Sequence, residues 1–335
     1  RRMIMNKSLY IVAFSLAFAT TGIAQNNEGQ DKTVDLGTQT TTELRKTQAV
    51  STIYSDELDK NATTSPYNAI YGLLPGLTVM QNTSWGTDKS RLNVRGRGSL
   101  NGDTPLFVVD GFARPIEYIN LSEIESISVL KDGAASAIYG TRGSNGVILI
   151  NLKKGTKDGQ VHTTYSTSVT FNKAKKELDI MNAEEYRAYR TVSNPLSDMG
   201  ADSDWFDAVT QLGVTHMHTL TFSGGNARTN YRVTADYRNA RGIDLRSDRH
   251  EYGARANINH TTKDGLFTFS ANITPRVIDR NKSANVYSNA IKNNPTMPIY
   301  DSESANGYYR FPSGTEGSNI VEQLNEEENG TEIKL

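Results

Sequence analysis

The sequence contains no cysteine among its 335 residues. This absence excludes a disulfide framework and any site in which cysteine thiolates hold a metal. An excess of basic charge is also missing, because 36 Lys and Arg residues are balanced by 37 Asp and Glu residues, for a net charge of −1. Nucleic-acid binding needs a clustered excess of Lys and Arg, so the composition argues against a nucleic-acid partner.

The sequence also lacks long apolar runs. A membrane-spanning helix needs about 20 consecutive apolar residues, and no segment after residue 24 has that length. If the protein lies in a membrane, it must therefore cross as a β-barrel, in which half of the residues of each strand face water.

The first 24 residues have the pattern of a signal peptide. Three basic residues precede an apolar run over Leu9–Thr20: Arg1, Arg2 and Lys7. Gly22-Ile-Ala24 is a small-x-small site for signal peptidase, so we expect cleavage after Ala24. The run is too short for the alternative, a transmembrane anchor. We expect translation to start at Met3 or Met5, and the polar sequence around Leu335 favours a fragment of a longer protein.

Residues 25–47 are rich in Thr, Gln, Asn and Asp, a composition that cannot bury enough apolar surface to fold alone. Residues 48–156 then predict a compact α/β domain. We expect helices over Asn68–Leu74, before Pro75-Gly76, and over Gly133–Gly140. The expected strands are Leu77–Met80, Leu92–Val94, Leu106–Val109 before the Asp110-Gly111 turn, Ile127–Leu130 and Val147–Ile150.

From residue 157 to 335 the pattern changes to strict alternation. Val161–Phe171, Tyr231–Tyr237 and Phe267–Ile273 each place apolar residues on one face and polar residues on the other. Such strands fit a half-solvated antiparallel sheet or a barrel wall between lipid and water. The connections favour the barrel, because Gly224–Asn226 and Lys263–Gly265 are tight turns whereas residues 172–213, 240–249 and those after 278 form long polar loops. Barrels of the outer membrane have this asymmetry.

No enzyme site is indicated. Gly96-Arg-Gly98 lacks the third glycine of a dinucleotide-binding motif, and the glycines from Gly140 to Gly146 have the wrong spacing for one. His216 and His218 share one strand face and permit a metal pair, but no third ligand accompanies them, so barrel-wall residues are the simpler interpretation. We therefore expect neither a cofactor nor a resident metal.

Four segments together carry a resemblance to a known family. They are Leu92-Asn-Val-Arg-Gly-Arg-Gly-Ser-Leu100, Pro105-Leu-Phe-Val-Val-Asp-Gly111, Val129-Leu-Lys-Asp-Gly133 and Ala137-Ile-Tyr-Gly-Thr-Arg-Gly-Ser-Asn-Gly-Val-Ile-Leu-Ile150. In this order they resemble the plug domain of the SusC/RagA family of TonB-dependent outer-membrane transporters. The resemblance implies an α+β plug followed by antiparallel strands of a truncated transmembrane β-barrel.

The resemblance also implies a function, namely import of a nutrient across the outer membrane of a Gram-negative bacterium, with the plug gating the barrel. An oligosaccharide is the first expectation and a peptide the second. A siderophore or cobalamin receptor and a non-transporting surface or adhesion protein stay open as alternatives. The implied partners are TonB with ExbB and ExbD, a SusD-like surface lipoprotein and outer-membrane lipid.

Two sets of residues are candidates for the mechanism. Thr33-Val34-Asp35-Leu36-Gly37 resembles the Ton box that contacts TonB, although an ordinary linker has a similar composition. A flexible segment of this kind could add to a strand of the partner. The second set comprises Arg95, Arg97 and Arg142, which could tie the plug to carboxylates of the barrel wall or stand as exposed surface charges.

Overall fold

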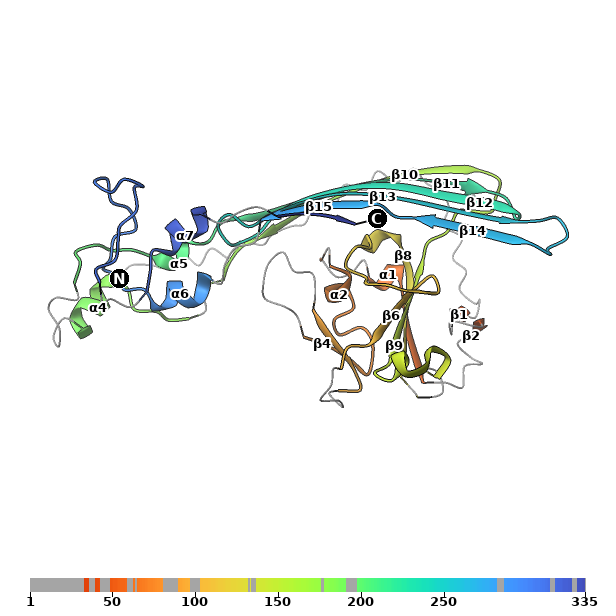
Figure 1. Cartoon of the computed structure of the whole chain (residues 1–335), viewed down its shortest axis with the longest axis horizontal. Coiled ribbons are helices and arrows are strands. Elements are labelled where there is room, and N and C mark those ends of the chain that lie inside the picture. The colour runs from red at the N-terminus through yellow and green to blue at the C-terminus, as the bar shows by residue number, and fades with distance from the viewer. Residues whose placement is uncertain are drawn as a thin grey trace, which may run out of the picture.

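The computed structural model describes residues 33–35, 40–42, 49–58, 63, 65–80, 90–96, 103–131, 133, 137–175, 178–190, 198–281, 286–313, 317–326 and 330–334. The predicted signal peptide lies outside these residues. A long curved sheet extends over one side of a compact α/β domain, and several short helices lie beyond one end of the sheet (Figure 1).

The α/β domain is built on a sheet of five strands in the order β3-β8-β9-β6-β7. Its central strand, β9, pairs in parallel with β6 and antiparallel with β8. Five of the six residues of β9 are buried, as expected for a strand covered on both faces. The strands are β3 (Val50–Tyr54), β6 (Leu106–Val109), β7 (Phe112–Ala113), β8 (Ile124–Leu130) and β9 (Val147–Leu152).

Apolar residues pack on both faces of this sheet. The larger cluster includes Ile70, Leu92, Ile127 and Ile150, and it joins the sheet to the remaining elements of the domain. A smaller cluster around Val108 and Leu149 lies on the other face. The remaining elements are α1 (Ser55–Leu58), α2 (Pro66–Ala69), the hairpin of β4 (Leu77–Met80) and β5 (Arg91–Val94), and the 3₁₀ helices η2 (Leu121–Glu123) and η3 (Ala137–Gly143).

The first predicted helix of this domain is wrong in extent. It ends at Ala69, and turns replace the helix up to Gly76, where Gly72 and Gly76 adopt positive φ angles of 74° and 81°. Glycine reaches such angles without a Cβ clash. In the second predicted helix, Gly133 is helical, residues 134–136 lie outside the described residues, and a 3₁₀ helix over Ala137–Gly143 is kinked at Gly140 with φ 62° and ψ −151°.

The long sheet consists of seven antiparallel strands in the order β10-β11-β12-β13-β15-β16, with β14 also paired to β13. β14 and β15 continue one another along β13, interrupted at Thr274-Pro275, where proline has no N–H to donate. The strands are β10 (Val161–Asn172), β11 (Gly213–Gly225), β12 (Thr229–Arg241), β13 (Asp248–Thr261), β14 (Thr268–Ile273), β15 (Arg276–Asn281) and β16 (Gly330–Lys334).

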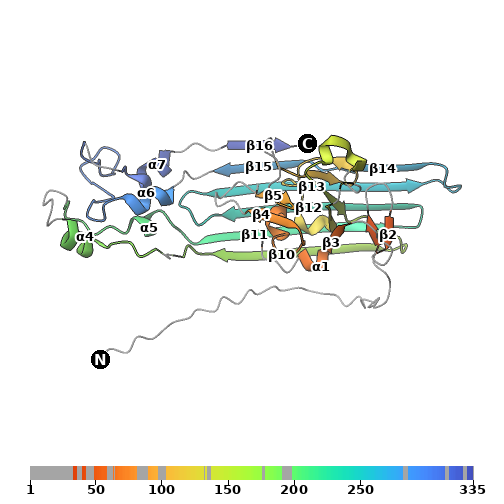
Figure 2. The same cartoon turned by 90° about the horizontal axis from the view of Figure 1, so that it is seen from below.

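The connections of the long sheet differ at its two ends, as the sequence predicts. Tight turns join β11 to β12 and β13 to β14 at one end, whereas the helices lie at the other (Figure 2). The helices at this end are α4 (Ala183–Arg190), α5 (Trp205–Ala208), α6 (Val286–Lys292) and α7 (Ile320–Glu326). Of these, α5, α6 and α7 share an apolar cluster centred on Trp205, Val209 and Ile320. The loops at this end therefore form a packed unit. Among the described residues, no helix has the length and hydropathy required to cross a membrane.

Candidate functional site at the plug-to-wall interface

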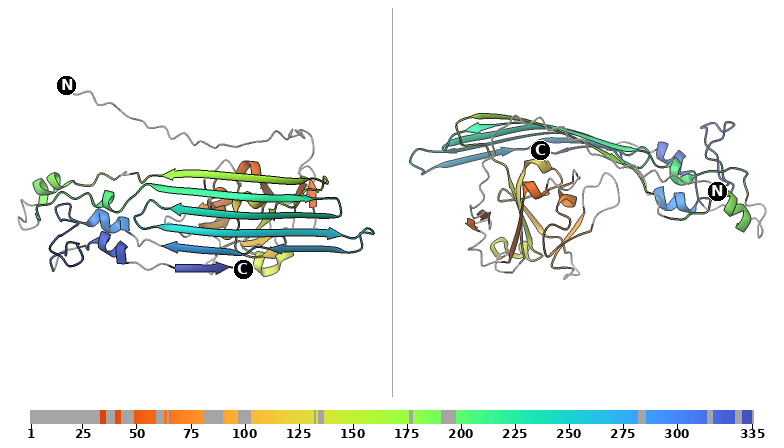
Figure 3. Two further views of the ribbon diagram at one scale, coloured as in Figure 1. Left: turned by 90° about the horizontal axis from the view of Figure 1, so that it is seen from above. Right: turned by 180° about the vertical axis from the view of Figure 1, so that it is seen from behind.

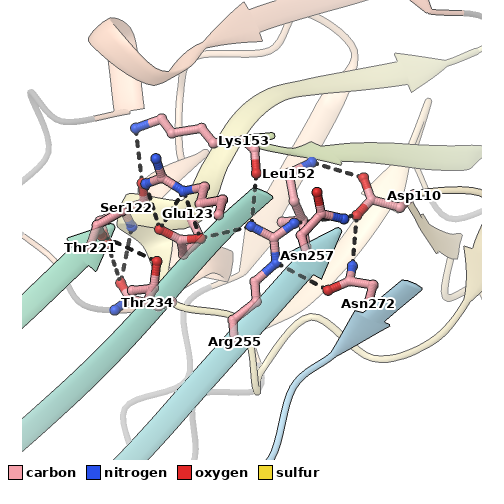
Figure 4. A network of polar contacts seen from close by, with 12 residues as sticks. Asp110, Ser122, Glu123, Leu152, Lys153, Thr221, Thr234, Arg255, Asn257 and Asn272 are labelled. Carbon is pink, nitrogen blue, oxygen red and sulfur yellow. Dashed lines mark hydrogen bonds and ion pairs between the residues drawn. The ribbon is translucent and has the colours of Figure 1, made fainter. Parts of the chain in front are cut away.

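The face of the long sheet that is turned toward the α/β domain is polar, and its side chains hold the domain in place. We call the α/β domain the plug and the long sheet the wall. On β12 and β13 the buried positions alternate with more exposed ones along the chain. Buried Thr234, Arg255 and Asn257 lie on the face toward the plug (Figure 4). Val233 and Ala254 occupy alternate positions and therefore lie on the opposite face.

Glu123 is the centre of the contact. It ends η2, a turn that begins when the side chain of Asn120 accepts a hydrogen bond from the backbone N–H of Ser122, at 3.0 Å. The carboxylate of Glu123 is buried and lies between two wall arginines. Arg232 donates from Nη2 to Oε1 at 2.7 Å and from Nε to Oε2 at 3.1 Å, and Arg255 donates from Nη1 to Oε2 at 2.7 Å.

This arrangement is charge-assisted and largely dry. Burial by itself would raise the pKa of Glu123, but the hydrogen bonds and positive charges of Arg232 and Arg255 outweigh it and hold the pKa below its ordinary value. Glu123 is therefore ionised at neutral pH, and the bidentate geometry of Arg232 fixes the orientation of the plug against the wall.

A second bridge links the plug to the wall through Asp110. Asn272 of β14 donates to Oδ2 of Asp110 at 3.1 Å, and the other carboxylate oxygen accepts the N–H of Leu152 at 3.0 Å. Arg255 connects the two bridges, because it also donates to the backbone carbonyl of Lys153 at 2.8 Å and to Asn272 at 3.3 Å. The sequence predicts Asp110 only as a turn residue, and its φ of 47° agrees with a turn. The structure adds a contact with the wall.

Arg114 lies near this bridge, on the plug side. Burial lowers the pKa of its guanidinium. The negative charge of Asp110 raises this pKa, and the positive charge of Arg255 lowers it further. Its Nε and Nη2 atoms are buried and have no hydrogen-bond partner among the described residues. The interface thus brings a second guanidinium, besides that of Arg255, close to the carboxylate of Asp110.

The wall also contains an ionic cluster between neighbouring strands. Glu251 of β13 pairs with Arg238 and Arg249, and Arg276 of β15 donates to Glu251 at 2.8 Å and to Asp236 at 2.9 Å. Gly253 provides the space, since a Cβ there would lie 2.6 Å from the side chains of Arg276 and Asp236. These ion pairs link β12, β13 and β15 to one another.

The residues predicted from the sequence lie elsewhere. Arg95 and Arg142 are exposed, and the structure places neither of them in the contact with the wall. Arg97 lies outside the described residues. Their role as ties between plug and barrel stays a prediction, and the pairs that the structure does show use wall arginines and a plug glutamate.

The segment with the Ton-box pattern is described in part. Thr33–Asp35 form a strand, β1, that pairs antiparallel with β2 (Thr40–Thr42), whereas Leu36 and Gly37 lie outside the described residues. The hairpin is a separate two-stranded sheet. In the part of the chain that the structure describes, one edge of β1 therefore has no strand beside it.

The two candidate metal ligands lie on the outer side of the wall. The rings of His216 and His218 are 6.0 Å apart, and both contact the ring of Tyr237. No cluster of three or more His, Asp or Glu residues able to hold a metal occurs within the described ranges. The structure thus places this pair among aromatic side chains.

Comparison with known proteins agrees with this architecture. The TonB-dependent receptor plug domain family matches residues 42–147. The TonB-dependent receptor SusC of Bacteroides thetaiotaomicron is 32% identical over 315 residues, which cover 87% of this chain and 30% of the relative. The TonB-dependent receptor P26 of Formosa agariphila is 28% identical over 319 residues, covering 90% of this chain and 32% of the relative.

Solved structures show the same fold. The RagAB peptide importer in its open-open state superposes with a TM-score of 0.66 at 24% identity, over 76% of this chain and 33% of that chain. The chain thus spans about a third of the length of these relatives. The plug match, the SusC relative and the shared fold identify the chain as a member of the SusC/RagA family of TonB-dependent receptors, of which it contains the plug domain and several strands of the barrel wall.

Proposed function

We propose that the receptor that carries this chain imports an oligosaccharide across the outer membrane of a Gram-negative bacterium, with energy delivered through TonB, ExbB and ExbD. The observation that supports gating by the plug is the clamp on Glu123, in which a plug carboxylate is held by two wall arginines. A plug held by a few ionic contacts can gate a barrel, because it is stable at rest and can be released by a force applied at one point.

In this proposal, TonB binds and pulls the segment Thr33–Gly37. Its strand β1 is paired on one side by β2, and its other edge offers backbone N–H and C=O groups to a partner strand. Pairing of this kind gives affinity through main-chain hydrogen bonds. Tension on the segment would pass through β3, which pairs with β8, the strand that directly follows Glu123.

We further propose a division of the chain into a signal peptide over 1–24, a linker over 25–47, a plug over 48–156 and the beginning of the barrel over 157–335. A SusD-like surface lipoprotein is the proposed partner at the outer mouth. The likeness to SusC, and to a two-component importer such as RagAB, supports this partner.

Oligosaccharide import rests on the similarity to SusC, and one observation favours peptide import as the second candidate. A pocket of about 280 Å³ lies among the loops at the helical end of the wall, lined mainly by Leu178, Ile180, Phe206, Ile243, Tyr287 and Ile291. Such a lining suits an apolar side chain of a peptide better than a sugar hydroxyl. Growth of a strain that lacks the gene, compared on oligosaccharides and on peptides as sole carbon source, separates the two.

Deletion of Thr33–Gly37 from the gene tests the proposed function. We expect uptake of the nutrient that requires the gene to fall to the level of the gene deletion, while the amount of receptor in the outer membrane stays unchanged. Deletion of Asn26–Gln30, five residues of the same linker, is the matched control and should leave uptake intact. Normal uptake after the Thr33–Gly37 deletion would refute the assignment of this segment to TonB.

A further inference from the structure

The contact between plug and wall joins more positive than negative groups. The guanidinium groups in it are those of Arg114, Arg232 and Arg255. The carboxylates that face them are those of Asp110 and Glu123. Figure 4 shows the guanidinium of Arg255 between these two carboxylates. Arginine stays protonated in proteins, so within this group of five side chains one positive charge is in excess.

The carboxylate of Asp110 does not use the hydrogen-bond donors of the arginines beside it. Its Oδ1 accepts the backbone N–H of Leu152 at 3.0 Å, and its Oδ2 accepts the side chain of Asn272 at 3.1 Å. Nη2 of Arg255 lies 3.8 Å from Oδ2, beyond hydrogen-bonding distance. Asp110 therefore attracts Arg255 and Arg114 by its charge and leaves donors of both unused.

Buried donor atoms gather at this place without an acceptor. Nε and Nη2 of Arg114, Nη2 of Arg255 and Oγ1 of Thr274 are buried and have no hydrogen-bond partner among the described residues. The side chain of Arg255 is only 5% exposed, so bulk water does not reach it. Buried donors are rarely left unpaired in folded proteins, and a bound water or ion is one of the few reasons for a group of them.

The three side chains come together from the plug and from the wall. Arg114 follows β7 at the edge of the plug sheet, and burial, Asp110 and Arg255 are the influences on its pKa, which places its guanidinium beside both groups. Thr274 lies in the interruption between β14 and β15, which pair with β13 on either side of Arg255. Asn272 contacts the plug, and alternation puts Thr274 on the same face.

We propose that a small monovalent anion, namely chloride, binds between Arg114, Arg255 and Thr274. All three side chains can donate hydrogen bonds, and a halide ion accepts several at once. Its negative charge cancels the positive charge in excess, which a water molecule would not do, and an uncompensated buried charge is costly. The anion then bridges the plug to the wall, because Arg114 belongs to one and Arg255 to the other. The inference does not depend on the identity of the cargo or on TonB.

Resistance of the plug to trypsin in urea tests the site in the purified receptor. Sodium chloride is titrated against sodium gluconate at constant ionic strength, so that general screening of charges stays the same. A ligand that binds only the docked plug stabilises it in proportion to the logarithm of its concentration once the site is filled. We expect the urea concentration of half-digestion to rise with chloride in this way for the wild type.

Arg114→Gln separates the site from a general effect of chloride. The variant lacks the excess charge and part of the site, so its resistance should not rise with chloride. In gluconate it should be at least as resistant as the wild type, which shows that it folds. Lys157→Gln is the matched control, because Lys157 is exposed on the segment between plug and wall, and it should keep the full chloride effect. An equal rise for Arg114→Gln and the wild type would place the action of chloride elsewhere and overturn the proposal.

Bromide identifies the occupant directly. In crystals of the receptor grown with sodium bromide, the anomalous difference map should show a peak in contact with the guanidinium groups of Arg114 and Arg255, and the peak should be lost in Arg114→Gln. A water molecule at this position, or a carboxylate from another part of the receptor, would overturn the proposal. A bromide peak in a wild type whose urea resistance does not depend on chloride would show an adventitious ion only, and would overturn it as well.

Discussion

At the scale of single residues, the plug is held by charges that come from opposite sides of an interface. Glu123 belongs to the plug, whereas Arg232 and Arg255 belong to the wall. The cluster around Glu251 differs, because the described residues of that cluster are all in the wall. Departure of the plug would leave Arg232 and Arg255 without their carboxylate. Part of the cost of opening therefore falls at Glu123.

Replacement of Glu123 by glutamine is expected to loosen the plug. The change keeps the shape of the side chain but removes the charge that faces Arg232 and Arg255. Loss of one partner of a buried ion pair costs about 3–5 kcal/mol. The urea concentration at which trypsin begins to digest the plug of the purified receptor measures this loss, and it should fall clearly for Glu123→Gln.

Glu125→Gln is the matched control for this experiment. Glu125 lies two residues further along the chain and is exposed, so its replacement should leave the urea concentration within the error of the wild type. Equal behaviour of the two variants would show that the clamp does not hold the plug.

Acid should weaken the same contact. The pKa of Glu123 is lower in the folded protein than its ordinary value of 4.5, so its stabilising effect is complete above that value and is lost as the pH falls through the lower folded pKa. The difference in urea resistance between wild type and Glu123→Gln should be constant from pH 8 to 6 and should shrink below pH 4.5. A difference that persists undiminished at pH 3 would contradict the assigned charge state.

The residues of the clamp could not be identified from the sequence alone. Alternation places Arg232 on the polar face of its strand. The sequence alone does not distinguish the polar positions that contact the plug from those that do not. Glu123 and Glu125 are equally acidic and differ only in burial. Glycine-flanked Arg95 and Arg142 attract attention in the sequence, yet both are exposed. The contact depends on how two distant segments meet.

At the scale of secondary structure, alternation of apolar and polar residues predicted the strands. The extents of short helices could not be predicted in this way. Val161–Phe171 falls within β10, and Leu106–Val109 coincides with β6. Asn182 and Glu185 form a reciprocal cap of α4, with N–H to side-chain distances of 3.0 and 2.9 Å. In β3 and β15 apolar and polar residues alternate less clearly. These segments form strands because β3 pairs with β8 and β15 pairs with β13.

The segment that joins plug and wall has a steric requirement at Gly155. A Cβ there would lie 2.3 Å from the backbone oxygen of Tyr231 on β12. Gly155→Ala should push the segment off the wall and weaken the contact of Arg255 with Lys153, at a cost of about 1–3 kcal/mol, as is usual for overpacking. Urea resistance of the plug, measured as above, should fall.

Gly133→Ala controls for the loss of a glycine, since a Cβ at Gly133 meets no atom within 4 Å. Its plug should be digested at the same urea concentration as that of the wild type. An unchanged Gly155→Ala variant would mean that the segment can move away from β12 without cost.

At the scale of the whole molecule, the two faces of the long sheet differ. Its inner face contacts the plug through Asn120, Glu123 and Asp110, and its outer face exposes apolar side chains such as Phe269 and Ile273. The order of a plug followed by alternating strands could be predicted from the sequence, because both parts have long local patterns. The way in which the plug docks against the sheet appears only in three dimensions (Figure 3). The apolar pocket among the loops likewise depends on contacts between distant segments.

The central claim is that the plug must separate from the wall near Glu123 for cargo to pass. Asn120 of the plug donates to Thr219 of β11 at 3.4 Å, beside the clamp. Because the sequence lacks cysteine, the double variant Asn120→Cys/Thr219→Cys introduces one defined cross-link. Each single variant serves as a control for the loss of the hydrogen bond.

Uptake of the gene-dependent nutrient by cells with this double variant, measured before and after reduction with dithiothreitol, is the most direct test. We predict that uptake is blocked while the disulfide is closed and returns to the level of the single variants after reduction. Uptake at the wild-type rate with the disulfide fully closed would contradict the claim that the plug leaves the wall at this site.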